Sequence, residues 1–320
     1  MSAEQSRDVT ALREFDVLTL GEAMVLFAAQ EPGPLEEAVR FHRFCAGAEL
    51  NVAIGLTRLG HRVAYLSRLG NDSAGRFLLR TLAQEGIASG LVQIDDNHPS
   101  GFMLKSKAVD GQDPQIEYHR KGSAASRMGV ADRHRLADIR ARHLHLTGIT
   151  PALSPSCREL VFATSAWARE QGMTISFDPN LRKPLWASTE DMQETLCAIA
   201  ARSDIVLPGH AEGTALTGLE SPQDIAQRFL SRGAKQVVVK LGAAGAWCAS
   251  SDGLAVQVPG VQVDRVVDTV GAGDGFAVGV ISGLLEGLDL AAATARGNAI
   301  GARVVQFPGD SDGLPRKDEL

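Results

Sequence analysis

The sequence predicts an α/β fold built on a mostly parallel sheet, and three observations support this. Between about residues 144 and 240, short apolar runs alternate with segments of helical periodicity, the pattern of strands joined by covering helices. Of the 320 residues, 44% are hydrophobic, which is enough for a large buried core. Near the C-terminus, a glycine-rich turn separates a run typical of a strand from one typical of a helix.

The first 120 residues predict less regular elements. Apolar runs that end at turn residues indicate strands, and segments that end at Gly60 and Gly86 indicate helices. Two extended runs on either side of a turn at 110–114 indicate a hairpin. We expect strands at 15–20, 22–29, 39–46, 63–66, 102–109 and 115–120, and helices at 47–60 and 74–85.

The later elements alternate more regularly. Residues 178–182 directly follow an expected strand, and open α/β sheets bind ligands beyond the carboxyl ends of their strands. This stretch is therefore a candidate ligand contact, although Asp178 also suits a simple turn cap. We expect strands at 144–147, 173–177, 204–207, 236–240 and 261–267, and helices at 154–171, 189–202, 210–217, 221–231, 275–285 and 291–305.

Composition and charge exclude several classes of protein. The net charge of −6 argues against a general binder of nucleic acid, and no apolar run approaches the roughly 20 residues that span a membrane. The four cysteines are widely spaced and predict free thiols in a reducing cytoplasm. Residues 1–14 are polar and predict a disordered tail. The closing letters 317–320 match an ER-retention signal, but we interpret them as a charged terminus.

The turn Asp268-Thr269-Val270-Gly271-Ala272-Gly273-Asp274 is the strongest candidate for a catalytic site. Its small residues leave backbone N–H groups open at the start of a helix, where the helix dipole favours an anion such as phosphate. A carboxylate at Asp274 would repel that anion, so its presence there suggests another task. Accepting a proton from an attacking hydroxyl is such a task, and a plain helix cap is the alternative.

Two segments together resemble the ribokinase-like (PfkB) carbohydrate kinases. One is the turn just described, and the other runs from 46 to 60 and on to 75, with Ala46 in place of the usual first glycine. The resemblance implies a three-layer α/β/α sandwich over residues 15–320, with a small β-sheet lid formed by about 23–46 and 100–121. It implies Asp274 as catalytic base and Gly271, Ala272 and Gly273 as an anion hole. It also implies pairing through the lid into a homo-oligomer.

A closer resemblance concerns the acceptor. Strand alternation places Tyr118 and Arg120 on one face, and such a cluster suits a carboxylate. With Arg182 in Asp178-Pro179-Asn180-Leu181-Arg182, this segment is similar to the 2-keto-3-deoxygluconate (KDG) kinases, which phosphorylate a sugar acid at its 6-hydroxyl. The resemblance implies substrate contacts at Gly47, Asn51, Tyr118, Arg120, Arg182 and Asp310. Met103 replaces a second tyrosine of that subfamily, and Leu26 replaces an aspartate of the fructokinases.

The same resemblance implies ATP and Mg²⁺ as cofactors, with a monovalent cation as a further candidate. Nucleotide contacts are expected at Lys240, Gly242, Gly245, Gly273 and Asn298, and Glu212 is expected to support the metal through water. Three alternatives stay open. These are a kinase of another sugar (fructose, 5-dehydro-2-deoxygluconate or the galactonate epimer), a non-catalytic sugar-binding regulator, and an oxidoreductase. The last would need a GxGxxG motif after the first strand, where Gly21-Glu22-Ala23-Met24 stands instead.

Overall fold

The computed structural model describes residues 13–107 and 114–320. These residues form a nine-stranded sheet and a separate four-stranded sheet. The expected disordered tail falls almost wholly outside the described residues, as does most of the turn at 110–114. Within the described part of the chain, no helix combines the length and apolarity needed to cross a membrane.

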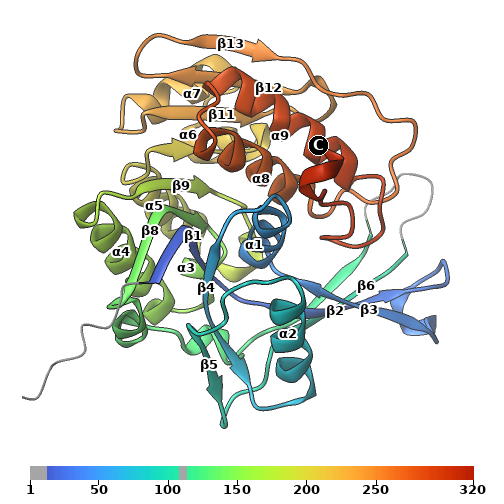
Figure 1. Cartoon of the computed structure of the whole chain (residues 1–320). Coiled ribbons are helices and arrows are strands. Elements are labelled where there is room, and N and C mark those ends of the chain that lie inside the picture. The colour runs from blue at the N-terminus through green and yellow to red at the C-terminus, as the bar shows by residue number, and fades with distance from the viewer. Residues whose placement is uncertain (1–12, 108–113) are drawn as a thin grey trace, which may run out of the picture.

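The large sheet is parallel except at one edge, as the βα alternation predicts (Figure 1). Its strands, in spatial order, are β13 (Ala255–Val258), β12 (Ala246–Ser250), β11 (Gln236–Lys240), β10 (Ile205–Val206), β9 (Thr174–Asp178), β8 (Ile139–Thr147), β1 (Arg13–Leu20), β4 (Val63–Gly70) and β5 (Val92–Asp95). Only the β11–β12 and β12–β13 pairs are antiparallel. The carboxyl ends of the parallel strands therefore meet at one edge, where polar loops can converge.

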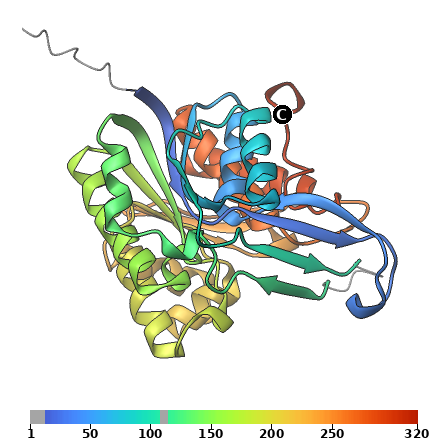
Figure 2. The same ribbon diagram turned by 90° about the horizontal axis from the view of Figure 1, so that it is seen from below.

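Helices cover both faces of this sheet. Side chains alternate along the strands, so that Val17 lies in one core and Leu18 in the other, both fully buried. One core packs α1 (Ala48–Arg58), α2 (Ser73–Gln84), α8 (Ala272–Leu285) and α9 (Leu290–Val304). The other packs α3 (Thr150–Leu153), α4 (Pro155–Glu170), α5 (Thr189–Ala200), α6 (His210–Thr217) and α7 (Pro222–Leu230). The result is a three-layer α/β/α sandwich (Figures 1 and 2).

Close packing fixes α8 between its neighbours. A Cβ atom built on Gly279 would lie 2.5 Å from the Cα of Gly297 in α9, and one on Gly55 in α1 would lie 2.5 Å from a methyl of Val278. All ten residues from 274 to 283 of α8 are buried, which agrees with a helix that is apolar on all sides. The N-terminus of α8 is therefore held rigidly where the site lies.

The small sheet projects beside the sandwich (Figure 2). It contains β3 (Phe41–Ala46), β2 (Met24–Ala29), β6 (Phe102–Lys105) and β7 (Ile116–His119), in that spatial order. The β2–β6 pair is parallel and the outer pairs are antiparallel. Short 3₁₀ turns complete the described elements: η1 (Leu35–Glu37), η2 (Ala125–Arg127), η3 (Val130–Leu136), η4 (Lys183–Leu185), η5 (Gly242–Ala244) and η6 (Lys317–Glu319).

Some expected elements are wrong. Residues 261–267 form no strand, because no neighbouring strand pairs with them; the N–H of Val267 instead donates to the carbonyl of Val305. The expected helix at 154–171 is preceded by a separate short helix, α3, and begins at Pro155 after the cap of Ser154. Strands β5, β12 and β13 were not expected, and β8 begins at Ile139, five residues before the expected start at Leu144.

Candidate active site

Two cavities meet at the N-terminus of α8. The first cavity, of about 510 Å³, lies between the small sheet, the loop after β9 and α8. The second cavity, of about 450 Å³, lies between α8, α9 and the loops around β11 and β13. Lys240, Thr269 and Gly273 line both. Two molecules, one bound in each cavity, would therefore meet at the first turn of α8.

The corner itself requires glycine. Gly271 has φ of 84°, and a Cβ there would lie 2.3 Å from the carbonyl oxygen of Asp310. The helix starts at Ala272, whose N–H donates a 3.3 Å hydrogen bond to the carbonyl of Thr269, whereas the N–H groups of the next two residues have no carbonyl partner four residues back within the helix. Together with the helix dipole, they form a positive edge toward the junction of the two cavities.

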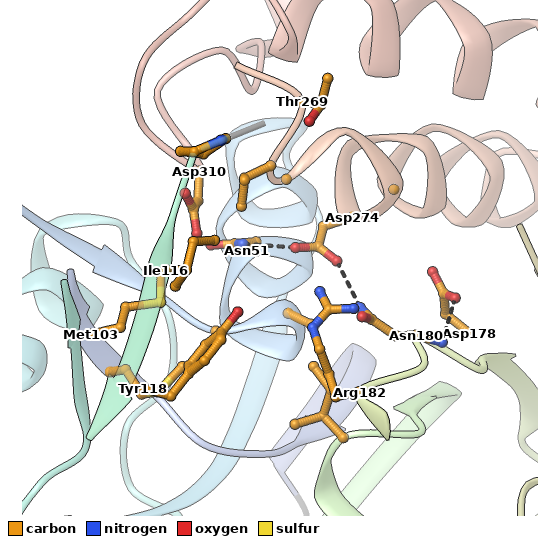
Figure 3. A pocket seen from close by; sticks show the side chains of 18 of the residues that line it. Asn51, Met103, Ile116, Tyr118, Asp178, Asn180, Arg182, Thr269, Asp274 and Asp310 are labelled. Carbon is orange, nitrogen blue, oxygen red and sulfur yellow. Dashed lines mark hydrogen bonds between the residues drawn. The ribbon is translucent and has the colours of Figure 1, made fainter. Parts of the chain in front are cut away.

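Asp274 lies in this first turn and lines the first cavity (Figure 3). The side chain of Asn51 donates a hydrogen bond of 2.7 Å to its Oδ2, and that of Asn180 donates one of 3.5 Å to its Oδ1. Burial raises the pKa of Asp274 to about 7, and the Asp178 carboxylate adds to the increase. A carboxyl group with this pKa can accept a proton near neutral pH.

Asn180, in the 178–182 stretch predicted as a ligand contact, has an unusual backbone conformation in the structure. Its φ of 38° is the single positive value found among the described non-glycine residues. Its N–H bonds the carboxylate of Asp178, which forms the tight turn after β9. Backbone strain of this kind is retained where the surroundings demand one geometry, and here it directs the amide toward Asp274.

The small sheet supplies the facing wall of the first cavity. Tyr118 of β7 pairs with Met103 of β6, and both side chains face the cavity with Ile116 (Figure 3). Tyr118 is 42% exposed, so its hydroxyl is accessible. Asn51 and Gly47 also line the first cavity, and the Oδ1 of Asn51 has no hydrogen-bond partner within the described residues. The cavity thus offers donors and acceptors to a polyhydroxylated ligand.

Both arginines predicted to bind a carboxylate line the first cavity, but their charges are paired differently. Arg120 is buried, and its Nε donates a 2.6 Å hydrogen bond to the carboxylate of Glu22, which also accepts from Ser123. The guanidinium charge of Arg120 is therefore already offset. Arg182 donates to the carbonyl of Leu181, and no carboxylate of the described residues lies within ion-pair distance of it. Of the two, Arg182 has the charge available for an anionic ligand.

Lys240 and Glu212 lie near the junction. The Nζ of Lys240 is 2.7 Å from the Asp178 carboxylate. Although burial alone lowers the pKa of Lys240, the carboxylates of Asp178 and Glu212 raise it above its usual value. Both oxygens of Glu212 accept backbone N–H groups, from Leu181 and from Gly209. Both carboxylate oxygens of Glu212 are thus engaged by the backbone, and its expected water-mediated metal contact stays a prediction.

The second cavity has a different lining. Glycine backbone and valine side chains dominate it, and the amide of Asn298 donates to the carbonyls of Val258 and Pro259. At Gly245, φ is 94° and a Cβ would lie 2.1 Å from the carbonyl oxygen of Val258. Gly242 and Gly245 therefore shape the wall, and Asn298 holds it. Residues 261–267, wrongly expected as a strand, contribute Val261, Val263 and Val266 to this lining.

Sequence reasoning overlooked Lys105 and Glu22. Glu22 is the buried partner of Arg120, and Lys105 is the buried partner of Asp310, which also lines the first cavity. Strand alternation contains a signal for the lysine, because Met103 and Lys105 share the inward face of β6. Among the described residues, no cluster of three or more His, Cys, Asp or Glu side chains could hold a metal ion.

Known proteins resemble this chain over nearly its whole length. The sequence profile of the pfkB family of carbohydrate kinases matches residues 14–317. A 2-dehydro-3-deoxygluconokinase of Bacillus subtilis (strain 168) is 48% identical over 310 residues, which cover 96% of this chain and 94% of the relative.

Solved structures agree. A PfkB protein from Polaromonas sp. JS666 superimposes with a TM-score of 0.87 at 50% identity, covering 95% of this chain and 98% of that one. A putative ribokinase II from E. coli, solved in complex with ATP and Mg²⁺, superimposes with a TM-score of 0.87 at 27% identity, covering 95% and 97%. The ribokinase-like fold expected from the sequence is confirmed.

Proposed function

The chain belongs to the pfkB family of carbohydrate kinases, and we propose that within it this enzyme transfers the γ-phosphoryl group of ATP to the 6-hydroxyl of KDG. The products are ADP and KDG 6-phosphate. The observation that carries the chemistry is the buried Asp274 at the start of α8, at the junction of two cavities. The 48% identical relative named 2-dehydro-3-deoxygluconokinase supports the substrate, since 2-dehydro-3-deoxygluconate is KDG.

Asp274 acts as the general base in this proposal. Its carboxylate takes the proton of the 6-hydroxyl as that oxygen attacks phosphorus, and its pKa of about 7 suits this transfer at neutral pH. Asn51 and Asn180 hold the carboxylate in one orientation. The N–H groups of Gly271 to Asp274 stabilise negative charge on the transferring group, because they are oriented before the reaction begins.

The acidic end of the sugar lies toward Arg182 in this proposal. Arg182 lines the cavity without an ion-pair partner among the described residues, whereas the charge of Arg120 is offset by Glu22. The hydroxyl of Tyr118 and the free Oδ1 of Asn51 supply further hydrogen bonds to the sugar. Binding at this remote end orients the 6-hydroxyl toward Asp274 and so contributes to the rate.

The second cavity suits the nucleotide. Its valine side chains and glycine backbone fit a flat base, and Lys240, which lines both cavities beside Asp178, lies where phosphate would be received. The E. coli relative solved with ATP and Mg²⁺ supports both groups. Mg²⁺ when bound neutralises charge on the β- and γ-phosphates. The oxygens of Glu212 are occupied by backbone N–H groups, so we assign it a water-mediated contact.

The small sheet acts as a lid in this proposal. Met103, Ile116 and Tyr118 cover the first cavity, and closing it would exclude water from the phosphoryl group. Its outer strands, β3 and β7, have free edges within the described sheet, and such edges suit pairing with a second copy.

The test is an ADP-release assay with Mg²⁺-ATP against KDG, its C4 epimer, 5-dehydro-2-deoxygluconate, fructose and ribose. We expect the highest kcat/KM for KDG, with product identified by phosphorus NMR as the 6-phosphate. Turnover restricted to a neutral sugar would contradict the sugar-acid assignment but keep the kinase. Binding of KDG without turnover of any sugar would favour the regulator that the sequence left open.

A further inference from the structure

Lys105 is a buried cation whose role the proposed reaction has not yet used. It is the last residue of β6 in the small sheet and is only 2% exposed. Its Nζ lies 2.6 Å from Oδ2 of Asp268, 2.9 Å from Oδ1 of Asp310 and 3.2 Å from the carbonyl oxygen of Pro308. An ammonium has three N–H donors, so all of them are used.

These partners belong to the two segments that shape the phosphate corner. Oδ1 of Asp268 accepts the N–H of Val270, one residue before Gly271. The carbonyl of Asp310 lies against Gly271, where even a methyl group would clash at 2.3 Å. The ammonium therefore joins the small sheet to the turn that carries the first N–H groups of α8.

The Lys105 ammonium also offsets the charge of two buried carboxylates. Asp268 and Asp310 are 6% and 4% exposed, so two carboxylates are buried close to where a phosphoryl anion must be received. Burial raises the pKa of Asp310, and the Lys105 ammonium opposes that increase. Although burial alone lowers the pKa of Lys105, the carboxylates of Asp310 and Asp268 raise it above its usual value. Without the ammonium, the carboxylates would repel each other and the incoming phosphate.

We infer that Lys105 is a positioning residue for phosphoryl transfer: its ammonium acts as a built-in monovalent cation that holds the Asp268–Asp310 pair and, through it, the Gly271 turn. This inference rests on the proposed kinase function. It implies that the wild-type enzyme needs no added monovalent cation. It also implies that truncating the lysine opens a cage of two carboxylates and one carbonyl, a set of oxygen ligands suited to a small cation.

The experiment compares Lys105→Met with Lys107→Met, a matched control. Lys107 lies two residues away, is exposed, and donates to the carbonyl of Gln30 on the neighbouring strand end. Kinetics are measured in tetramethylammonium salts, which are too large for the cage, and then with added NH₄⁺ or K⁺. We expect Lys105→Met to lower kcat about 100-fold with a smaller change in the KM for the sugar, because the turn is displaced. NH₄⁺ or K⁺ should restore part of that loss saturably, and Lys107→Met should match wild type.

Three results would overturn the inference. One is a folded Lys105→Met variant whose kcat stays within about threefold of wild type. Another is a loss of kcat that neither cation restores. The third needs no variant: a wild-type enzyme whose kcat falls more than about tenfold when K⁺ and NH₄⁺ are replaced by tetramethylammonium. If wild type phosphorylates no sugar acid in any salt, the proposed function fails instead, so the two failures are distinguishable.

Discussion

The two cavities on either side of the α8 N-terminus differ in the groups that line them. In the first cavity, the polar atoms belong to buried side chains such as Asp274, Asp178 and Asp310. In the second cavity, glycine backbone and valine side chains form most of the surface. Side chains can be exchanged without rebuilding the backbone, so the acceptor can diverge within this fold while the nucleotide site stays the same. The comparison predicts that substitutions in the first cavity alter chemistry and acceptor choice, and those in the second alter nucleotide affinity.

Asp274→Asn is expected to have the largest effect. The amide keeps the shape and the hydrogen bond from Asn51 but cannot take a proton, so kcat should fall about 10³- to 10⁴-fold. The measurement is steady-state kinetics with KDG, with ATP binding followed by calorimetry. The control is Asp138→Asn, at an exposed site. A variant that retains more than about a tenth of wild-type kcat would remove Asp274 from the role of base.

Arg120→Met tests whether the buried Arg120–Glu22 ion pair contributes to folding stability or to substrate binding. Its side chain is 6% exposed and that of Glu22 is 0% exposed, so truncation leaves Glu22 buried and unpaired. We expect the free energy of unfolding in urea to fall by about 3 kcal/mol. The double variant Glu22→Gln/Arg120→Met should regain part of it. Unchanged stability with lost KDG binding would support the substrate-binding role that the sequence predicts for Arg120, which lines the first cavity.

Arg182→Met should act on the substrate instead. Arg182 makes no ion pair within the described residues, although its charge lowers the pKa of the nearby Asp274, so its removal should cost less stability than that of Arg120. We expect kcat/KM for KDG to fall about 100-fold, the value of a lost charge-assisted hydrogen-bond pair, with little change in melting temperature. Activity on a neutral sugar should fall less, because the Arg182 charge also lowers the pKa of Asp274 and its removal would affect the base for any substrate. An equal loss on sugar acid and neutral sugar would contradict the carboxylate assignment.

The pH dependence should follow Asp274. The base must be ionised, so kcat/KM should fall about tenfold per pH unit below about 7, the pKa to which burial raises this group. Folding stability should change with pH in the opposite direction. The usual pKa is 3.8, so between there and about 7 the folded protein holds a proton that the unfolded chain releases, and this contribution to stability is lost as pH rises. Melting curves of wild type and Asp274→Asn between pH 5 and 8 give the difference. A flat rate profile across pH 6 to 7 would contradict the raised pKa.

Asn298→Ala should have the smallest effect. Its amide donates to two carbonyls that shape the second cavity, so its loss should loosen the wall. We expect the KM for ATP to rise about fivefold, equivalent to roughly one hydrogen bond, while kcat and the KM for KDG stay unchanged. A larger effect on kcat than on the KM for ATP would show that the two cavities are less independent than their linings suggest.

Local sequence was sufficient for much of this molecule. Period-2 and helical patterns predicted most strands and helices of the sandwich, because each pattern reflects the face that a segment buries. The turn at 268–274 was predicted as a phosphate corner because its small residues and its helix lie consecutively in the chain. The run 261–267 was wrongly predicted as a strand, because β-branched residues also suit the lining of an apolar cavity.

Tertiary structure alone decided how the charges pair. Strand alternation placed Arg120 on the cavity face, but only the fold brings Glu22, 98 residues away, against it. The same holds for Lys105 and Asp268, which are 163 residues apart. The pKa of Asp274 likewise depends on burial by segments that are distant in the chain. The sequence by itself thus determined which residues could do chemistry, because motif and turn are local; only the folded chain decided which charges are free to do it, because pairing and desolvation depend on contacts between remote segments.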